Sequence, residues 1–358
     1  MNSSPTASPA ASRSASVPAP KVHRIGRFAI LRELGHGSIG SVYLGHDPVI
    51  DRSVAIKTIN PRLSAPEKRR YEQHFINEAR AAGRLSHPNI VTIFDASSEG
   101  ETIYIAMEYL EGRELAGLLD SGHRYAPEEI AAIVGKVAGA LDYAHRHQVI
   151  HRDIKPANIF MMADGEPKVV DFGIARAPNR LPSQSDAGAA PFTLFHNNLL
   201  GTPCYMSPEQ ALGRPADART DVYSLGAVMY EMLTGSKPFQ ARDTAQLLQS
   251  VAYKNPRPPH MLDAAIPLPL SEIVMKAMSK RAEKRYQTAR EMARDLQRYL
   301  VMEKRGRRLL KKESAVARQA AAGPLRHGRR MLYQAGGLAA LGMIAIAGLQ
   351  LMLRWRGA

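Results

Sequence analysis

The segment at residues 151–158, His-Arg-Asp-Ile-Lys-Pro-Ala-Asn, constrains this chain more than any other part of its sequence. It places a potential base (Asp153), a cation (Lys155) and a metal-binding amide (Asn158) in one short loop. A carboxylate can orient and deprotonate a hydroxyl, a lysine can neutralise a phosphoryl oxygen, and an amide oxygen can hold a divalent ion. Phosphoryl transfer needs these three tasks, because its catalysis is mostly positioning and electrostatic stabilisation.

A second motif follows this loop, Asp171-Phe172-Gly173. The tripeptide His-Arg-Asp alone recurs by chance and is a weak signal, whereas the two motifs together in this order are a strong one. On these residues the chain resembles the protein kinase superfamily. The resemblance implies an α+β, bilobal protein kinase fold, with a small β-rich N-terminal lobe and a larger α-helical C-terminal lobe on either side of a cleft.

The hydrophobic pattern divides the chain in the same way. Short apolar runs that are typical of strands dominate the first part, with one helical stretch near 67–84, and a spacing near 3.6 residues predicts helices further on. Residues 25–302 are therefore predicted to form one catalytic unit. The predicted strands are 28–31, 41–44, 54–59, 90–94 and 103–107, and the predicted later helices are 127–147, 219–234 and 287–302.

A glycine-rich motif, Gly-His-Gly-Ser-Ile-Gly at 35–40, lies near the start of the catalytic unit. A Rossmann dinucleotide site would need a helix directly after the glycines. Residues 41–44 instead continue as a strand, so the glycines lie at a hairpin tip and the Rossmann alternative is rejected. In kinases such a loop covers the phosphates of ATP, and the corresponding residues here are Leu34, Gly35, Gly37 and Gly40.

The resemblance also implies how ATP and its metal ions are held. Lys57, at the end of Val-Ala-Ile-Lys, matches the strand lysine that contacts the α- and β-phosphates, although a lysine there can also extend to solvent. Glu78 is its expected partner, with Glu72 as a competing candidate. Asp171 is expected to bind Mg²⁺ and Asn158 a second ion, with Mn²⁺ as an alternative, because carboxylate and amide oxygens suit hard cations.

The segment Met-Glu-Tyr-Leu-Glu-Gly at 107–112 resembles the hinge between the lobes, whose backbone binds adenine in the family. Glu108 is therefore an expected ATP-binding residue. Met107 is expected at the rear of the adenine pocket. The residues expected to sandwich the ring are Val42, Ala55 and Phe160.

Residues 201–209, Gly-Thr-Pro-Cys-Tyr-Met-Ser-Pro-Glu, resemble the end of an activation segment, with Ser207 replacing the alanine of Ala-Pro-Glu. By resemblance Glu209 is expected to pair with Arg285, and Asp221 to brace the catalytic loop. Arg152 is a cation suited to a phosphate, so activation by autophosphorylation is expected. The candidate acceptors in the activation segment are Ser183, Ser185, Thr193 and Thr202.

Lys155 and Thr202 are features of serine/threonine kinases, so the resemblance implies protein serine and threonine hydroxyls as acceptors. The chain looks like the bacterial Hanks-type branch, which often carries a single transmembrane helix. A transient homodimer is expected for phosphorylation in trans. Cys204 is the one cysteine, which excludes an intrachain disulfide and favours a reducing compartment; it is either an incidental small residue or a redox brake.

The net charge of +15 is concentrated in the tails. Residues 303–330 hold ten Lys or Arg against two Glu, and 25–302 keep only +2. This distribution favours a membrane surface and argues against nucleic acid as a partner. Residues 331–353 are uncharged, and as a helix they would be about 34 Å long, enough to cross a bilayer core of ~30 Å.

The expected order is therefore a disordered leader (1–24), the kinase domain (25–302), a basic juxtamembrane segment (303–330), a transmembrane helix (331–353) and a short tail (354–358). The leader has no signal peptide. The expected location is the cell inner membrane, with the kinase domain on the cytoplasmic side. A buried C-terminal helix is the alternative for 331–353.

Two functions from other classes compete with the enzyme. A pseudokinase would keep the fold as a binding scaffold, but Lys57, Asp153 and Asp171 are all present. An adaptor acting through its basic tail on a membrane or nucleic acid is the second alternative, and the charge distribution weakens its nucleic-acid version.

Overall fold

The computed structural model describes residues 23–36, 40–59, 76, 79–80, 82–99, 102–172 and 203–321. The chain divides into two units, Met1–Met302 and Glu303–Ala358. The sheets, the site and nearly all helices belong to the first unit, to which the description below applies.

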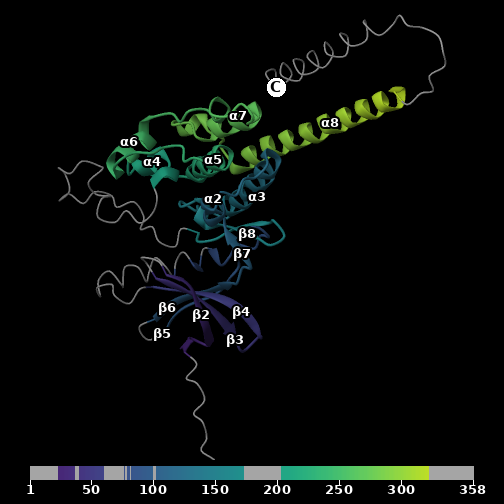
Figure 1. The fold of residues 1–358 in the computed structure, drawn as a ribbon. Coiled ribbons are helices and arrows are strands. Elements are labelled where there is room, and N and C mark those ends of the chain that lie inside the picture. The colour runs from purple at the N-terminus through teal and green to yellow at the C-terminus, as the bar shows by residue number, and fades with distance from the viewer. Residues whose placement is uncertain are drawn as a thin grey trace, which may run out of the picture. The chain divides into compact units, whose positions relative to one another are not determined.

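The N-terminal lobe is an antiparallel six-stranded sheet in the order β1-β2-β3-β4-β6-β5 (Figure 1). Its central strand β4 alternates between two apolar faces, as the two-residue period of a strand requires. Val54 and Ile56 pack with Phe28 on one face, whereas Ala55 packs with Met107 on the other. The strands are β1 (Arg24–Ile25), β2 (Phe28–His36), β3 (Ser41–Asp47), β4 (Arg52–Thr58), β5 (Ile93–Glu99) and β6 (Thr102–Glu108).

The strand predicted at 90–94 is displaced in the structure. β5 begins only at Ile93 and runs to Glu99. Ile90 forms an isolated parallel bridge with Val169, and the amide of Val91 donates to the carbonyl of Val169 at 3.0 Å. The first apolar residues of this run therefore pair with the C-terminal lobe, which a local hydrophobic pattern cannot distinguish from pairing within the N-terminal sheet.

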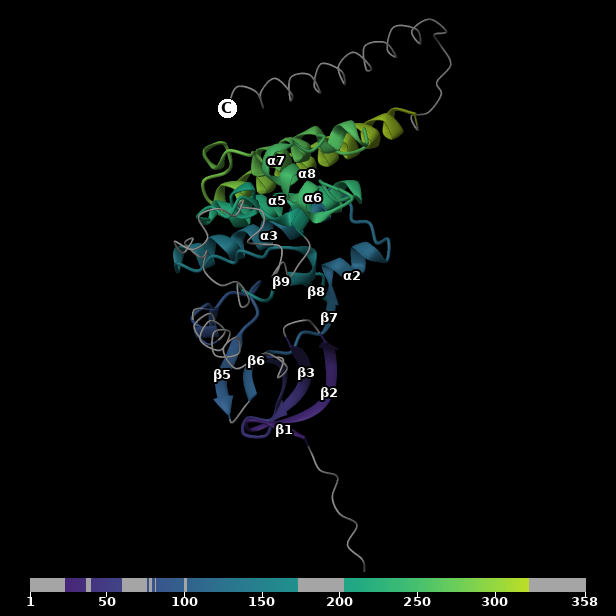
Figure 2. The same cartoon turned by 90° about the vertical axis from the view of Figure 1, so that its left-hand side faces the viewer.

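The C-terminal lobe is mostly helical and is built around α5 (Arg219–Thr234), which lies between α3 and α7 in Figure 2. Most of α5 is buried, since apolar residues occur around the whole helix and its buried polar residues, such as Asp221, bond to other parts of the lobe. A Cβ on Gly226 would lie 2.8 Å from Ala277 Cβ, so glycine permits the close approach of α7. The other helices are α2 (Leu115–Asp120), α3 (Pro127–Arg146), α4 (Pro208–Ala211), α6 (Thr244–Tyr253), α7 (Leu268–Ala277) and α8 (Ala289–Ala321).

A small sheet of β7 (Gly112–Glu114), β8 (Ile159–Met162) and β9 (Pro167–Val169) completes this lobe. The predicted bilobal α+β fold is confirmed. The helix predicted at 287–302 starts at Ala289 and continues to Ala321, since the following Ala, Glu, Lys and Arg residues are strong helix formers.

Two other predictions fall largely beyond the described residues. The helix expected near 67–84 is described only at 76, 79–80 and 82, which are helical. Across 23–321, leaving out the gaps given above, no helix is both long and apolar enough to cross a membrane. The predicted transmembrane segment 331–353 lies outside the described residues.

Candidate active site

The loop at 151–158 connects α3 to β8 and ends in the 3₁₀ turn η1 (Pro156–Asn158). The side chains of Lys155 and Asn158 both contact the Asp153 carboxylate. Lys155 Nζ lies 2.8 Å from Asp153 Oδ2, and Asn158 Nδ2 donates to the same carboxylate at 3.1 Å and to the main-chain oxygen of Asp153 at 2.8 Å. The Asp153 side chain keeps 26% of its surface exposed, so a substrate hydroxyl can reach the carboxylate.

Asp221 holds the start of this loop. It is completely buried on α5 and accepts hydrogen bonds from the amides of His151 (2.8 Å) and Arg152 (2.7 Å). Its carboxylate also lies 2.7 Å from Nε2 of His145. Arg152 has φ = 63°, a left-handed conformation that costs energy for a residue other than glycine. The two main-chain contacts therefore hold a strained backbone directly before Asp153.

His151 joins the loop to the segment that carries Asp171. Its Nδ1 accepts from the amide of Asp153 at 3.2 Å, and its Nε2 lies 2.9 Å from the carbonyl oxygen of Val170. Because a carbonyl oxygen can only accept, these contacts require the neutral tautomer with the proton on Nε2. The imidazole also lies against the ring of Phe172, with 4.7 Å between centroids.

Asp171 pairs with Lys57 of the N-terminal lobe, with 2.7 Å between Lys57 Nζ and Asp171 Oδ2. Burial opposes ionisation of Asp171, but the nearby charge and hydrogen bond of Lys57, with a smaller contribution from the charge of Lys155, hold the pKa of its carboxyl below the ordinary value. Asp171 also has a left-handed backbone (φ = 58°). The described partner of Lys57 is thus Asp171; the expected partner Glu78 and its competitor Glu72 lie outside the described residues.

The structure describes only part of the glycine-rich motif at 35–40, namely residues 35, 36 and 40. Gly40 directly precedes β3 and lies so close to the end of β4 that a Cβ would be 1.6 Å from the carbonyl oxygen of Thr58. Only glycine fits that position. Leu34 and Gly35 lie in β2, and Gly37 is outside the described residues.

An apolar cluster lies at the junction of the lobes. It consists of Ala55, Val91 and Met107, with three partly buried residues packed against them, Val42, Leu110 and Val170. Val42, Ala55 and Met107 are thus together, as the adenine-pocket prediction requires. Phe160 is not part of this cluster; it lies on β8 opposite Glu114 and Lys168.

Two charged residues of the cleft region were missed by sequence reasoning. Lys168 donates to both carboxylate oxygens of Glu108, at 2.7 and 2.8 Å. Glu114, at the end of β7, has a raised pKa because of burial and the charge of Asp171, which Lys155 partly offsets. Glu114 could have been identified from the sequence because it lies shortly after the predicted hinge. No motif near Lys168 indicates a role for that residue.

The end of the predicted activation segment is anchored by an ion pair. Arg285 donates from two nitrogens to the two oxygens of Glu209, each at 2.7 Å, and the hydroxyl of Thr220 donates to Glu209 at 2.7 Å. The Arg285 side chain is fully buried. Burial opposes ionisation of Glu209, but these donors hold the pKa of its carboxyl below the ordinary value.

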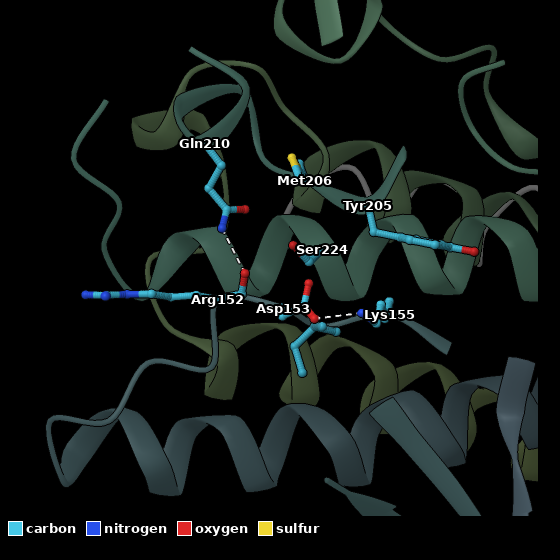
Figure 3. A pocket seen from close by; sticks show the side chains of 8 residues that line it. Arg152, Asp153, Lys155, Tyr205, Met206, Gln210 and Ser224 are labelled. Carbon is cyan, nitrogen blue, oxygen red and sulfur yellow. Dashed lines mark hydrogen bonds and ion pairs between the residues drawn. The ribbon is translucent and has the colours of Figure 1, made fainter. Parts of the chain in front are cut away.

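This anchored segment lines a small pocket beside the loop. Tyr205, Met206 and Gln210 face Asp153 and Lys155 across it (Figure 3). Cys204 is buried next to the pocket, and burial raises the pKa of its thiol to about 11. Because the thiolate is the reactive form, the incidental interpretation of Cys204 is favoured over a redox brake. Ser183, Ser185, Thr193 and Thr202 lie outside the described residues.

The fold and the arrangement of these residues define a kinase-like catalytic unit. A model of the protein kinase domain matches residues 28–309. The chain belongs to the protein kinase family.

Named relatives are serine/threonine protein kinases of bacteria. Serine/threonine-protein kinase PknB of Mycobacterium leprae is 38% identical over 278 residues, which cover 76% of this chain and 43% of PknB. Serine/threonine-protein kinase PrkC of Bacillus subtilis is 37% identical over 273 residues, covering 76% and 40%. The chain thus spans about two-fifths of the length of the curated relatives that it matches.

Solved structures agree with the fold. The kinase domain of PknI from Mycobacterium tuberculosis superimposes with a TM-score of 0.61 and 25% identity, over 78% of this chain and 99% of that domain. A second crystal structure of the same kinase domain gives a TM-score of 0.59 at 26% identity, over 78% of this chain and 97% of that domain.

Proposed function

We propose that this chain is an ATP-dependent serine/threonine protein kinase, which transfers the γ-phosphoryl group of Mg-ATP to protein hydroxyls. One observation carries this proposal: Lys155 and Asn158 both contact the Asp153 carboxylate, beside the Lys57–Asp171 pair. A base, a phosphate-neutralising cation and oxygen ligands for a metal ion are thereby held in one region of the molecule. Family membership and the names of the relatives support it.

Asp153 is assigned the role of orienting the acceptor hydroxyl and accepting its proton. Lys155 is assigned to a γ-phosphoryl oxygen, and on substrate binding its ammonium can contact both that oxygen and the carboxylate 2.8 Å away. Lys57 is assigned to the α- and β-phosphates and must then share or leave its contact with Asp171. These roles need positioned charges rather than covalent chemistry, as phosphoryl transfer does.

The donor set fits a magnesium ion bound together with a nucleotide. Among the described residues there is no group of three or more His, Cys, Asp or Glu suited to a metal ion. Magnesium typically takes one or two protein carboxylates plus phosphate oxygens and water. Asp171 is held ionised, and Asn158 uses its amide nitrogen on Asp153, which leaves the amide oxygen as its ligand. The ion neutralises phosphate charge when bound.

A radiolabel assay tests the function. The full chain is incubated with γ-labelled ATP, Mg²⁺ and a generic protein acceptor, and compared with Asp153→Asn. We expect the variant to lose several orders of magnitude in rate, because proton acceptance and hydroxyl orientation both fail. Asp51→Asn is the matched control, since Asp51 is 96% exposed and asparagine tolerates its left-handed backbone. Equal Mg²⁺-dependent incorporation by wild type and Asp153→Asn would favour a scaffold.

We further propose activation by phosphorylation in trans within a transient homodimer, with Ser183, Ser185, Thr193 and Thr202 as candidate acceptors. Arg152, the neighbour of Asp153 in the sequence, supplies a cation that suits a phosphate, and its side chain extends away from Asp153 and Lys155 in Figure 3. Phosphopeptide mapping of active protein tests this proposal. Absence of phosphate between 178 and 202 would contradict it.

Attachment to a membrane is the last part of the proposal. It rests on the uncharged segment 331–353 and the net charge of +8 on 303–330. Cell fractionation of the full chain against a 1–330 truncation tests it. Undiminished membrane association of the truncation would refute the anchor.

A further inference from the structure

The side chain of Gln210 connects two parts of the molecule. Its Nε2 donates to the carbonyl oxygen of Arg152 at 2.8 Å (Figure 3). Its Oε1 accepts from the amide of Ser207 at 3.1 Å and forms the capping box at the start of α4. One amide group thus bonds simultaneously to the end of the activation segment and to the catalytic loop.

The carbonyl that Gln210 holds belongs to the strained residue before the base. Arg152 has φ = 63°, and its amide already donates to Asp221 at 2.7 Å. The peptide groups on both sides of the Arg152 Cα are therefore fixed, one by Asp221 and the other by Gln210. The second of these peptide groups contains the amide nitrogen of Asp153, so rotation of that peptide would move the Asp153 carboxylate.

The two residues that hold these peptide groups, Asp221 and Gln210, lie in different parts of the C-terminal lobe. Asp221 lies on α5 in the core, whereas Gln210 lies on the four-residue helix α4. The position of α4 is fixed by the buried pair of Glu209 with Arg285. The Gln210 amide is therefore in place only when the end of the activation segment is docked on the C-terminal lobe.

We propose that Gln210 is a positioning residue, which couples docking of the activation-segment end to the orientation of Asp153. Its amide donor completes the support of the left-handed Arg152 peptide and so fixes the direction of the Asp153 carboxylate, which lines the small pocket of Figure 3 together with Gln210 and Met206. The inference rests on the proposed function, since it assigns Asp153 as the base.

Two variants of Gln210 separate the contact with Arg152 from the cap. Gln210→Glu keeps an oxygen that can accept from Ser207 but replaces the donor with an oxygen facing the Arg152 carbonyl. Gln210→Met removes both contacts at similar volume and adds no charge. We expect kcat to fall about 10- to 100-fold in both variants, because small displacements of a catalytic group have effects of this size. The KM for ATP should be unchanged.

Ser207→Ala is the matched control. It removes the hydroxyl of residue 207, which contacts Gln210 and Thr220. The hydrogen bond between Gln210 and the Arg152 carbonyl oxygen remains. We expect a lower melting temperature with kcat close to that of wild type. Melting temperatures of all variants are measured in parallel, so that loss of folded protein is not mistaken for loss of positioning.

The outcomes separate this inference from the proposed function. If wild type incorporates phosphate, Asp153→Asn does not, and both Gln210 variants retain the wild-type kcat, Gln210 has no positioning role. A rise in the KM for ATP at unchanged kcat would also overturn it. A kcat loss in Ser207→Ala equal to that in Gln210→Glu would assign the effect to the cap. If wild type itself shows no Mg²⁺-dependent incorporation above Asp153→Asn, the proposed function fails instead.

Discussion

Lys57 and Asp171 form an ion pair between the two lobes, with 2.7 Å between Nζ and Oδ2. Lys57 extends from strand β4 of the N-terminal lobe, and Asp171 follows β9 of the C-terminal lobe. The pair joins the lobes at the place where phosphates and metal ions are proposed to bind. Lys57 lowers the pKa of the Asp171 carboxyl and so favours the ionised form that its proposed role as a metal ligand needs.

The first prediction concerns the pKa of Asp171. Burial raises this pKa, and Lys57 is the largest of the influences that lower it. Lys57→Met should therefore move the pKa upward, so that ionisation of Asp171, and with it Mg²⁺-dependent nucleotide binding, is lost at a higher pH than in wild type. An NMR titration of the Asp171 carboxyl measures the shift. Lys136→Met is the control, since Lys136 pairs with Glu166 away from the cleft; an unchanged Asp171 titration in Lys57→Met would contradict the prediction.

The second prediction concerns stability and the pair of Glu209 with Arg285. Arg285→Met leaves a carboxylate that is only 16% exposed without its main partner, and breaking a buried pair in this way costs roughly 3–5 kcal/mol. Denaturant unfolding measures the loss. Arg298→Met, which removes a side chain that is 71% exposed from its pair with Asp295, should cost no more than about 1 kcal/mol. Equal losses in the two variants would contradict this assignment.

The pH dependence of stability gives the same pair a second, independent measurement. The folded-state pKa of Glu209 is lowered, so the stability that it contributes is present above its unfolded pKa of about 4.3 and is lost as pH falls through the folded value. Wild type should therefore lose more stability than Arg285→Met when the pH is lowered from about 5 to 3. Parallel slopes for the two proteins would show that Glu209 is not held ionised by Arg285.

The sequence predicted those parts of the site whose residues lie in short motifs. Asp153, Lys155 and Asn158 meet because they share one loop, and the Glu209–Arg285 contact was expected because both motifs are characteristic of the family. A short motif fixes both residue types and local backbone geometry, so it can be recognised without the fold.

Contacts between distant segments in which at least one residue lies outside these motifs could not be predicted in this way. Gln210 and Arg152 are joined only through the docking of α4 on the loop, and Lys168 on β9 meets Glu108 at the end of β6. The register of such contacts depends on tertiary packing, which no hydrophobic period encodes. The start of β5 was misplaced for the same reason, since Ile90 pairs with the other lobe.

The third prediction concerns the buried carboxylate of Asp221. Asp221→Ala leaves the amides of His151 and Arg152 without their acceptor, and each unsatisfied buried group costs about 1–3 kcal/mol. We expect lower stability together with a fall in kcat, because the strained backbone before Asp153 loses its support. Thermal unfolding and the radiolabel assay measure the two effects. Asp217→Ala is the control, since Asp217 is 55% exposed and pairs locally with Arg219. Full activity in Asp221→Ala would show that catalysis does not depend on the contacts of Asp221 with the backbone before Asp153.

The last prediction concerns Lys280, whose ammonium lies among aromatic rings and main-chain groups of the C-terminal lobe. Its Nζ donates to the carbonyl oxygen of Val251 at 2.7 Å and to the hydroxyl of Tyr223 at 3.0 Å, and it lies 4.3 Å from the centroid of Phe239. Burial, and to a lesser extent the charge of Arg285, lowers the pKa of Lys280 to about 7.

Between pH 7 and about 10 the unfolded chain therefore binds more protons at Lys280 than the folded protein does, so stability should rise with pH over this range. The slope from one such group is at most about 1.4 kcal/mol per pH unit. Denaturant unfolding of wild type and Lys280→Met at pH 7, 8 and 9 measures it, and the wild-type stability should increase relative to the variant at each step. A constant difference across these pH values would show that Lys280 keeps an ordinary pKa in the folded protein.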